Sequence, residues 1–292
     1  MTDHDLLDTA RVRARFNRAS DTYDRHALVQ QEIGRRLDER FEWLRLTPRR
    51  ILDLGAGTGQ LTVAMRRRFP RAQVVSLDLA EALLARVPKQ GRIWRRRAVV
   101  CADMHQLPFA AGSFDVVVSN FAVQWSQDLP RLFAEVARVL AAGGAFLFTT
   151  LGPQTLRECR LAWRSVDHAA HINQFTDLHE VGDALVSACF ADPVIDQEQL
   201  TAHYSSADAL LAELRAVGVG NSLTTRPRGL TGRKAWQAFM AALSAQAEPQ
   251  GVPLTYEVIY GLGWGAGISP LLGSAPLRVE SVSNDTKDRH LP

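Results

Sequence analysis

The sequence predicts an α/β protein built on a mostly parallel seven-stranded sheet, with helices on both faces and an added helical cap. Short apolar runs alternate with helical stretches in the first half of the chain, a pattern typical of parallel strands joined by right-handed crossovers. The first five expected strands are residues 51–54, 73–77, 98–101, 114–119 and 145–150. A glycine-rich turn follows the first strand, and such a turn lets a ligand approach the backbone.

The N-terminal residues 1–47 are expected to form a helical segment that serves as a lid over the substrate. Apolar residues from Ile33 to Leu44 recur there at spacings of four, four and three, which indicates one helical face. The helix is expected to end at Thr47 and Pro48, because a residue before proline disfavours the helical conformation.

Residues 48–204 are expected to form the α/β core. Its helices are expected at 60–69, 79–87, 129–140, 153–169 and 177–189. Asp177 and Glu180 have the spacing of a capping box, which marks the start of the last of these helices. A sixth strand is expected at 194–204.

The chain after the sixth strand is expected to add a cap and then complete the sheet. The connection at 205–252 is too long for a tight turn and contains helical stretches at 206–217 and 233–247, which predicts a helical cap. The last core strand is expected within 253–267. The polar, aperiodic residues 268–292 are expected to be a disordered tail.

Composition excludes several classes of protein. The chain has 292 residues, of which 46% are hydrophobic and 22% charged, so most of it can fold around a core. It has no run of 18 apolar residues, and its N-terminus lacks the apolar stretch of a secretory signal. The three cysteines lack CxxC spacing, so neither a disulfide framework nor a metal site is expected. These features predict a cytoplasmic protein that does not enter the membrane.

Charge is distributed unevenly along the chain. Residues 1–100 contain 21 Lys and Arg against 12 Asp and Glu, whereas the remaining residues contain 13 against 19. A basic first half favours an acidic partner, which could be a nucleic acid, a membrane surface or an acidic protein. Charge alone does not choose among these three.

The glycine-rich turn carries the most specific motif of the sequence. The run Ile-Leu-Asp-Leu-Gly-Ala-Gly-Thr-Gly at 51–59 leads from a strand into a helix, whose free N–H groups can bind a ligand. Asp78 ends the second strand, where a carboxylate can accept hydrogen bonds from two ribose hydroxyls. The pattern is GxGxG and not GxGxxG, and Asp53 lies inside the first strand, so a nicotinamide dinucleotide is disfavoured.

This set of motifs resembles the class I S-adenosylmethionine-dependent methyltransferases. The resemblance places the cofactor against Asp53, Gly55, Gly57, Asp78, Leu79, Asp103, Met104 and Asn120. It implies that the glycine turn lies under the methionyl part and that Asp53 lies near its amino group. It also implies that Asp78 binds the ribose, that Asp103 approaches the adenine, and that Asn120 lies beside the transferable methyl group.

A second resemblance extends to about residue 266 and concerns the substrate. Matching segments lie at 16–31, 119–125, 150–156, 171–175 and 256–261. They resemble the malonyl-carrier-protein O-methyltransferases of biotin biosynthesis. The resemblance implies that S-adenosyl-L-methionine methylates the free carboxylate of a malonyl thioester on acyl carrier protein, which gives the methyl ester that primes pimeloyl synthesis.

Methylation of a carboxylate does not require a general base, because the group is ionised at pH 7. We therefore expect Tyr23, Gln124 and Trp125 to form a pocket that positions the carboxylate, since tyrosine and tryptophan donate hydrogen bonds while their rings exclude water. His171 and Asn173 are expected to contact the acyl group. Tyr23 and Trp125 could instead be packing residues, and His171 could be a loop residue with its own hydrogen bonds.

The resemblance implies that the partner of the basic first half is acyl carrier protein and not nucleic acid. Arg66–Arg68 and Arg95–Arg97 are expected to contact the acidic surface of the carrier. Three alternatives remain at this point: a trans-aconitate type of small-carboxylate methyltransferase, a methyltransferase-like assembly factor or arginine hydroxylase of respiratory complex I, and an RNA methyltransferase. An Asn-Pro-Pro-Tyr motif, which would favour RNA methylation, is replaced by Ser-Asn-Phe-Ala at 119–122.

Overall fold

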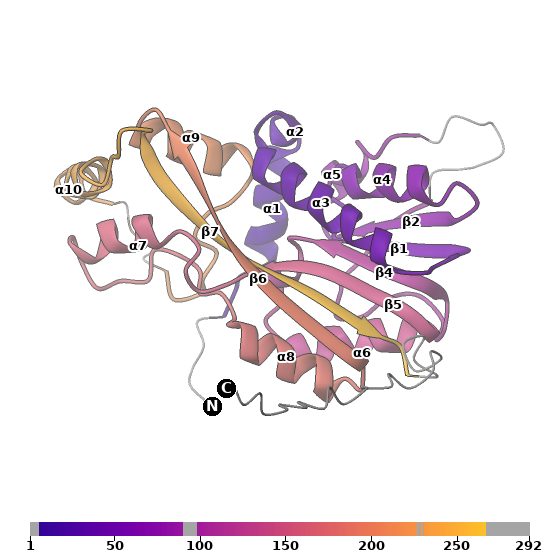
Figure 1. Ribbon diagram of the computed structural model, residues 1–292. Coiled ribbons are helices and arrows are strands. Elements are labelled where there is room, and N and C mark those ends of the chain that lie inside the picture. The colour runs from indigo at the N-terminus through magenta and orange to yellow at the C-terminus, as the bar shows by residue number, and fades with distance from the viewer. Residues whose placement is uncertain (1–5, 90–97, 227–228, 230, 267–292) are drawn as a thin grey trace, which may run out of the picture.

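The fold is an α/β sandwich around one seven-stranded sheet, which confirms the predicted fold class (Figure 1). The computed structural model describes residues 6–89, 98–226, 229 and 231–266. The strand order is β3-β2-β1-β4-β5-β7-β6. Neighbours from β3 to β5 are parallel, whereas β7 runs antiparallel to both β5 and β6. The expected tail from 268 lies outside the described residues.

The strands follow the predicted runs and are longest at one edge of the sheet. They are β1 (Arg50–Leu54), β2 (Gln73–Asp78), β3 (Ala98–Cys101), β4 (Phe114–Asn120), β5 (Leu140–Leu151), β6 (Ala191–Tyr204) and β7 (Val252–Trp264). The chain order reverses between β1 and β4, and the carboxyl ends of strands at such a reversal are where α/β proteins form a ligand-binding crevice. This crevice brings together the glycine turn after β1 and the residues that follow β4.

Helices cover both faces of the sheet, because the central strands are apolar on both sides (Figure 1). One face carries α4 (Gln60–Arg68) and α5 (Glu81–Leu84), and the other carries α6 (Leu129–Val139) and α8 (Leu178–Ser187). Helix α5 is shorter than the predicted 79–87. The N–H groups at its start donate to side-chain oxygens of Asp78 and Asn17, which fixes where the helix begins.

The N-terminal segment forms several short helices in place of one long one. They are α1 (Thr9–Ala19), α2 (Tyr23–His26) and α3 (Leu28–Arg40), followed by a 3₁₀ turn at Phe41–Trp43. The predicted apolar face is buried from Ile33 to Phe41. The helix ends earlier than expected because the Leu44 N–H donates to the Phe41 carbonyl and closes the 3₁₀ turn.

The cap is carried by a long antiparallel extension of the sheet. Strand β5 pairs with β7 only from Val258 to Trp264, so residues 252–257 of β7 pair with β6 alone and reach beyond the parallel core. Helices α7 (Arg157–Arg164), α9 (Ala207–Ala216) and α10 (Arg233–Ser244) gather around this extension (Figure 1). Helices α9 and α10 lie in the segment predicted as a cap, and α7 joins them although the sequence placed it in the core.

Replacing Gly55 by alanine is expected to lower the free energy of unfolding by about 1–3 kcal/mol more than replacing Gly112, the range for overpacking a close contact. A Cβ at Gly55 would lie 2.1 Å from the Ala122 Cβ, whereas a Cβ at Gly112 would meet no described atom within 4 Å. Both glycines have positive φ, +75° and +62°, so the control carries a similar backbone penalty. Urea unfolding without ligand measures both variants, and equal losses would contradict the account.

Candidate active site

The glycine turn adopts a conformation that only glycine reaches without strain. Gly55, Gly57 and Gly59 have φ of +75°, +55° and +89°. The N–H groups of Gly55 and Ala56 donate to the Leu77 carbonyl at 2.8 and 2.9 Å, which ties the turn to the end of β2. Helix α4 then begins directly after Gly59. The turn therefore presents its backbone to the crevice at the start of a helix, where free N–H groups favour anionic or electron-rich atoms.

Asp78 lies beside this turn as the spacing predicted. Its Oδ2 accepts the Gly57 N–H at 2.8 Å and its Oδ1 accepts the Ala80 N–H at 2.8 Å. Burial raises the pKa of Asp78, although these backbone hydrogen bonds favour the ionised form. A carboxylate held in this way can accept hydrogen bonds from the hydroxyls of a ribose.

Asp53 is fully buried at the base of the turn and has an unused oxygen. The Thr62 hydroxyl donates to its Oδ2, whereas its Oδ1 has no hydrogen-bond partner among the described residues. Burial raises the pKa of Asp53 to about 7 in spite of the Thr62 hydrogen bond. An unsatisfied, buried carboxylate fits a cationic ligand, because a nearby positive charge would stabilise its ionised form. The residues present therefore suit a cofactor that carries an ammonium group.

The other expected cofactor residues surround the same end of the sheet. Leu79 follows β2, and its carbonyl accepts the Cys101 thiol. Asp103 follows β3 and accepts hydrogen bonds from both the backbone and the ring of His105. Met104 packs against the core under α6. Asn120 ends β4, but its amide already bonds the Thr149 hydroxyl and the Gln30 carbonyl. Their roles in cofactor binding remain predictions.

Helix α2 lies over the glycine turn and fixes the lid. Asp24 accepts hydrogen bonds from the Thr58 hydroxyl and the Gln60 amide, both at the start of α4. The Tyr23 ring lies 4.0 Å from the place that a Cβ on Gly57 would occupy. Burial raises the pKa of Tyr23, and the negative charges of Asp78 and Asp24 raise it further. Tyr23 therefore stays a neutral hydrogen-bond donor next to the turn.

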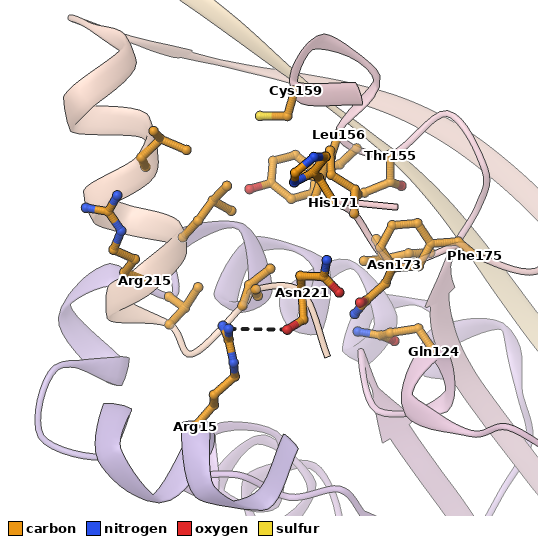
Figure 2. Close-up of a pocket in the computed structure, with 18 of the residues that line it drawn as sticks. Arg15, Gln124, Thr155, Leu156, Cys159, His171, Asn173, Phe175, Arg215 and Asn221 are labelled. Atoms are coloured by element: carbon orange, nitrogen blue, oxygen red, sulfur yellow. Dashed lines mark hydrogen bonds between the residues drawn. The ribbon is translucent and has the colours of Figure 1, made fainter. Parts of the chain in front are cut away.

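A cavity of about 440 Å³ lies between the lid and the cap (Figure 2). The five residues predicted to touch the substrate all line it, although they come from three separate segments: Tyr23, Gln124, Trp125, His171 and Asn173. Aromatic side chains supply much of the remaining wall: Phe16, Phe121, Trp163, Phe175, Trp236, Phe239 and Tyr256. No aspartate or glutamate is among its described lining residues. Such a cavity can hold an acyl chain and shield a reacting group from water.

Aromatic contacts join the cavity to the glycine turn. The Phe16 ring meets the Tyr23 ring at 6.4 Å and the Trp125 ring at 5.3 Å between centroids, both edge to face. Tyr23 thus lies between the turn on one side and the cavity on the other. Trp125 ends the short helix η2 (Val123–Trp125) after β4, is only partly buried and forms part of the cavity wall.

Gln124 and Asn173 are polar groups in this largely apolar wall (Figure 2). The Gln124 Nε2 donates to the Phe121 carbonyl at 2.7 Å, while its buried Oε1 has no partner among the described residues. The Asn173 Oδ1 accepts the Ser222 N–H at 3.0 Å, which ties the loop after α7 to the loop after α9. Gln124 therefore has unused hydrogen-bonding capacity for a ligand.

His171 lines the cavity, but its ring is already engaged. It stacks on Trp163 with centroids 3.7 Å apart and planes 6° apart, and its Nε2 lies 2.8 Å from an Asp167 oxygen. The alternative of a histidine with its own hydrogen bonds thus describes it well. Its place in the wall still allows an apolar contact with an acyl group.

Several lining residues have no motif in the sequence. Arg15, Arg215, Asn221 and Trp236 face the cavity from α1, α9, the loop after α9 and α10. Only Arg15 could have been noticed, because it directly precedes the matching segment at 16–31. The others depend on how the cap folds back.

Of the expected carrier-binding arginines, Arg66–Arg68 do not line the cavity. Arg68 forms an ion pair with Asp38, and Arg66 donates to the Pro88 carbonyl. Arg95–Arg97 lie outside the described residues. Among the residues that the structure describes, there is no group of three or more side chains suited to a metal ion and no helix long and apolar enough to cross a membrane.

Comparisons with known proteins show which proteins this chain resembles. Residues 52–148 match the family described as a methyltransferase domain. The malonyl-[acyl-carrier protein] O-methyltransferase of Laribacter hongkongensis is 44% identical and spans 92% of this chain and 94% of its own. The protein of the same name from Legionella pneumophila subsp. pneumophila is 45% identical and spans 85% of this chain and 88% of its own.

Solved structures share the fold at low sequence identity. YcgJ protein from Bacillus subtilis is 19% identical, covers 80% of this chain and 98% of its own, and has a TM-score of 0.56. A SAM-dependent methyltransferase from Thermotoga maritima is 16% identical, covers 87% and 99%, and has a TM-score of 0.51. These structures support the architecture alone.

The ionisation of Asp53 is expected to make stability depend on pH. Its pKa is about 7 in the folded protein and about 4 in an unfolded chain. Between these values the folded state binds one proton more, so the free energy of unfolding falls as pH rises, by up to about 1.4 kcal/mol per unit. The Asp53→Asn variant lacks this term.

Urea unfolding of both proteins from about pH 5 to about pH 8 measures the effect. The stability of the wild type relative to Asp53→Asn should fall up to about pH 7 and then level off. A constant difference over this range would show that Asp53 is already ionised in the folded protein at low pH.

Proposed function

The chain belongs to the malonyl-[acyl-carrier protein] O-methyltransferase family, and we propose that it methylates the free carboxylate of a malonyl thioester carried by acyl carrier protein. The enzyme is an S-adenosyl-L-methionine-dependent O-methyltransferase. The product is the methyl ester that primes pimeloyl synthesis for biotin. The observation that carries the proposal is the acid-free aromatic cavity, which meets the glycine turn at Tyr23. We further propose that the reaction takes place in the cytoplasm.

The residues of the crevice would hold the cofactor. S-adenosyl-L-methionine supplies an electrophilic methyl group on a positively charged sulfur. The glycine turn would offer backbone contact, Asp78 would accept hydrogen bonds from the ribose hydroxyls, and the free oxygen of Asp53 would favour the ammonium charge. Because Asp53 and Asp78 have raised pKa values without ligand, the positive charge of the cofactor favours their ionised forms.

The acceptor needs positioning and not deprotonation. A malonyl carboxylate is already ionised at pH 7. One of its oxygens can therefore form the bond to the methyl carbon, while the carbon–sulfur bond breaks and the electron pair of that bond stays on sulfur. No proton moves in this step. The reaction has no use for a general base, so His171 need not act as one. Its hydrogen bond to Asp167 and its stacking on Trp163 fit a residue that forms part of the cavity wall.

The aromatic wall favours the reaction by excluding water. The positive charge of the methyl donor and the negative charge of the carboxylate are neutralised as the methyl group moves. Water stabilises the separate charges, so a cavity that excludes water lowers the barrier to this neutralisation. Tyr23 and Trp125 can donate hydrogen bonds that hold the carboxylate in line with the methyl group. Phe16 packs between these two rings and keeps their spacing.

The other functions considered have weaker support. Relatives that span about nine-tenths of the chain share one name, whereas a trans-aconitate enzyme, a complex I assembly factor and an RNA methyltransferase rest on partial motifs. Incubation with labelled S-adenosyl-L-methionine and malonyl-carrier protein, malonyl-CoA or trans-aconitate tests the proposal. A labelled methyl ester should form on a malonyl thioester. Labelling of trans-aconitate alone, or of none of the three, would overturn it.

The basic surface that meets the carrier should lie close to the cavity. Arg160 and Arg164 lie on α7 beside Trp163, whose ring forms part of the cavity wall. Arg160 donates to the carbonyls of Pro153 and Thr155, which do not neutralise its charge. We propose that this face of α7 binds the acidic carrier, in preference to the Arg66–Arg68 run on α4.

Substitution of Tyr23 by phenylalanine is expected to lower kcat about 10- to 100-fold, because a hydrogen bond to a charged group is worth about 1.5–3 kcal/mol. The melting temperature should change little, since the ring remains. Tyr260→Phe is the matched control, because the Tyr260 hydroxyl donates to Glu198 outside the cavity. Equal effects of the two substitutions on kcat would show that the Tyr23 hydroxyl has no special role.

Reversal of charge at Arg164 should raise KM for malonyl-carrier protein about 10-fold, while turnover of malonyl-CoA changes about twofold or less, as expected for a charge that steers a protein partner. Arg67→Glu is the control, because Arg67 is also exposed but lies on α4. A larger loss for Arg67→Glu would place the carrier on α4 instead, as the sequence first suggested.

A further inference from the structure

The cavity carries positive charge that no acidic side chain balances. Its described lining includes two guanidinium groups, Arg15 and Arg215, and no aspartate or glutamate. Arg215 is exposed and lies over the Trp236 ring, 5.8 Å from its centroid. Arg15 is only partly exposed and reaches into the cavity from α1 (Figure 2).

Among the described residues, no carboxylate pairs with the charge of Arg15. Its guanidinium donates to the Asn221 carbonyl at 3.3 Å. Burial lowers the pKa of Arg15, and the like charges of Arg11, Arg18 and Arg226 lower it further. No carboxylate of the described residues is among the causes of this shift. A cation held partly out of water among other cations is unfavourable, and an anion bound beside it would relieve that cost.

The position of Arg15 is fixed by its packing. A Cβ on Gly220 would lie 1.7 Å from an Arg15 guanidinium nitrogen, so the guanidinium lies against the backbone of Gly220, in the loop after α9. The next residue, Phe16, contacts the rings of Tyr23 and Trp125. One turn of α1 therefore supplies both a cation and a piece of the aromatic wall to the same cavity.

We propose that Arg15 determines substrate specificity by binding the free carboxylate of the acyl group. The inference rests on the proposed function and deepens it. Before methyl transfer the acyl group carries one negative charge that pairs with Arg15; afterwards it is a neutral ester and the ion pair is lost. The same residue thus selects malonyl over neutral acyl thioesters and favours release of the product.

Three ligands measure this selectivity: carrier protein loaded with malonyl, with malonyl methyl ester and with acetyl groups. The wild-type enzyme should bind the malonyl form about 10- to 100-fold more tightly than either neutral form, the range of a hydrogen bond to a charged group. In Arg15→Gln this preference should fall to about twofold or less. The affinity for the malonyl form should fall, whereas the affinities for the two neutral forms should stay unchanged. Arg15→Lys should keep part of the preference because the charge remains.

Arg13→Gln is the matched control, because Arg13 is exposed on the same helix and its substitution removes the same charge. It should keep the wild-type preference. Equal weakening of all three ligands in Arg15→Gln would overturn the proposal, because Arg15 would then contact the shared arm or the carrier. An unchanged preference would overturn it as well.

The failure of the proposed function has a different signature. In that case the wild-type enzyme itself would show no preference for malonyl and no methyl ester would form. If Arg15→Gln does not fold, the comparison of Arg15→Lys with Arg13→Gln decides. Arg15→Lys keeps the positive charge, so it should keep part of the preference for malonyl. If Arg15→Lys loses the whole preference while Arg13→Gln keeps it, the ion pair is contradicted.

Discussion

The contact between the N-terminal lid and the glycine turn joins the two halves of the site. Asp24 holds the lid through the Thr58 and Gln60 side chains, and this places Tyr23 against the turn. The cofactor crevice belongs to the sheet, whereas the cavity belongs to the lid and cap. Without this contact the two would be separate sites, and an acyl carboxylate in the cavity would have no defined position relative to the methyl group.

The cap depends on a second connection, a buried carboxylate in the sheet extension. Glu158 of α7 accepts hydrogen bonds from the Thr255 N–H at 2.9 Å and from its hydroxyl at 2.6 Å, so α7 is tied to the part of β7 that leaves the core. Trp163 of the same helix stacks on Phe239 of α10 at 4.2 Å. These contacts give the cavity a rigid apolar wall, which a reaction governed by positioning and water exclusion requires.

Local patterns predicted the fold and placed the glycine turn and Asp78 together, but they did not predict the full cavity. The glycine turn and Asp78 were predictable because strand ends at one edge of a parallel sheet lie together. Tyr23 and Trp125 were reached through resemblance, since they are about a hundred residues apart in sequence. Arg15 and Asn221 were missed because their meeting depends on how α9 folds back on α1, and helical periodicity carries no information about that. The shorter lid helices reflect tertiary contacts in the same way.

A crystal structure of the enzyme with S-adenosyl-L-homocysteine and an unreactive malonyl analogue on its carrier tests the central claim most directly. The account predicts that the cofactor product lies along the glycine turn and that the acyl group lies in the aromatic cavity, with its carboxylate directed past Tyr23 towards the sulfur. An acyl group bound outside the cavity, or a cofactor separated from it by the lid, would contradict the account.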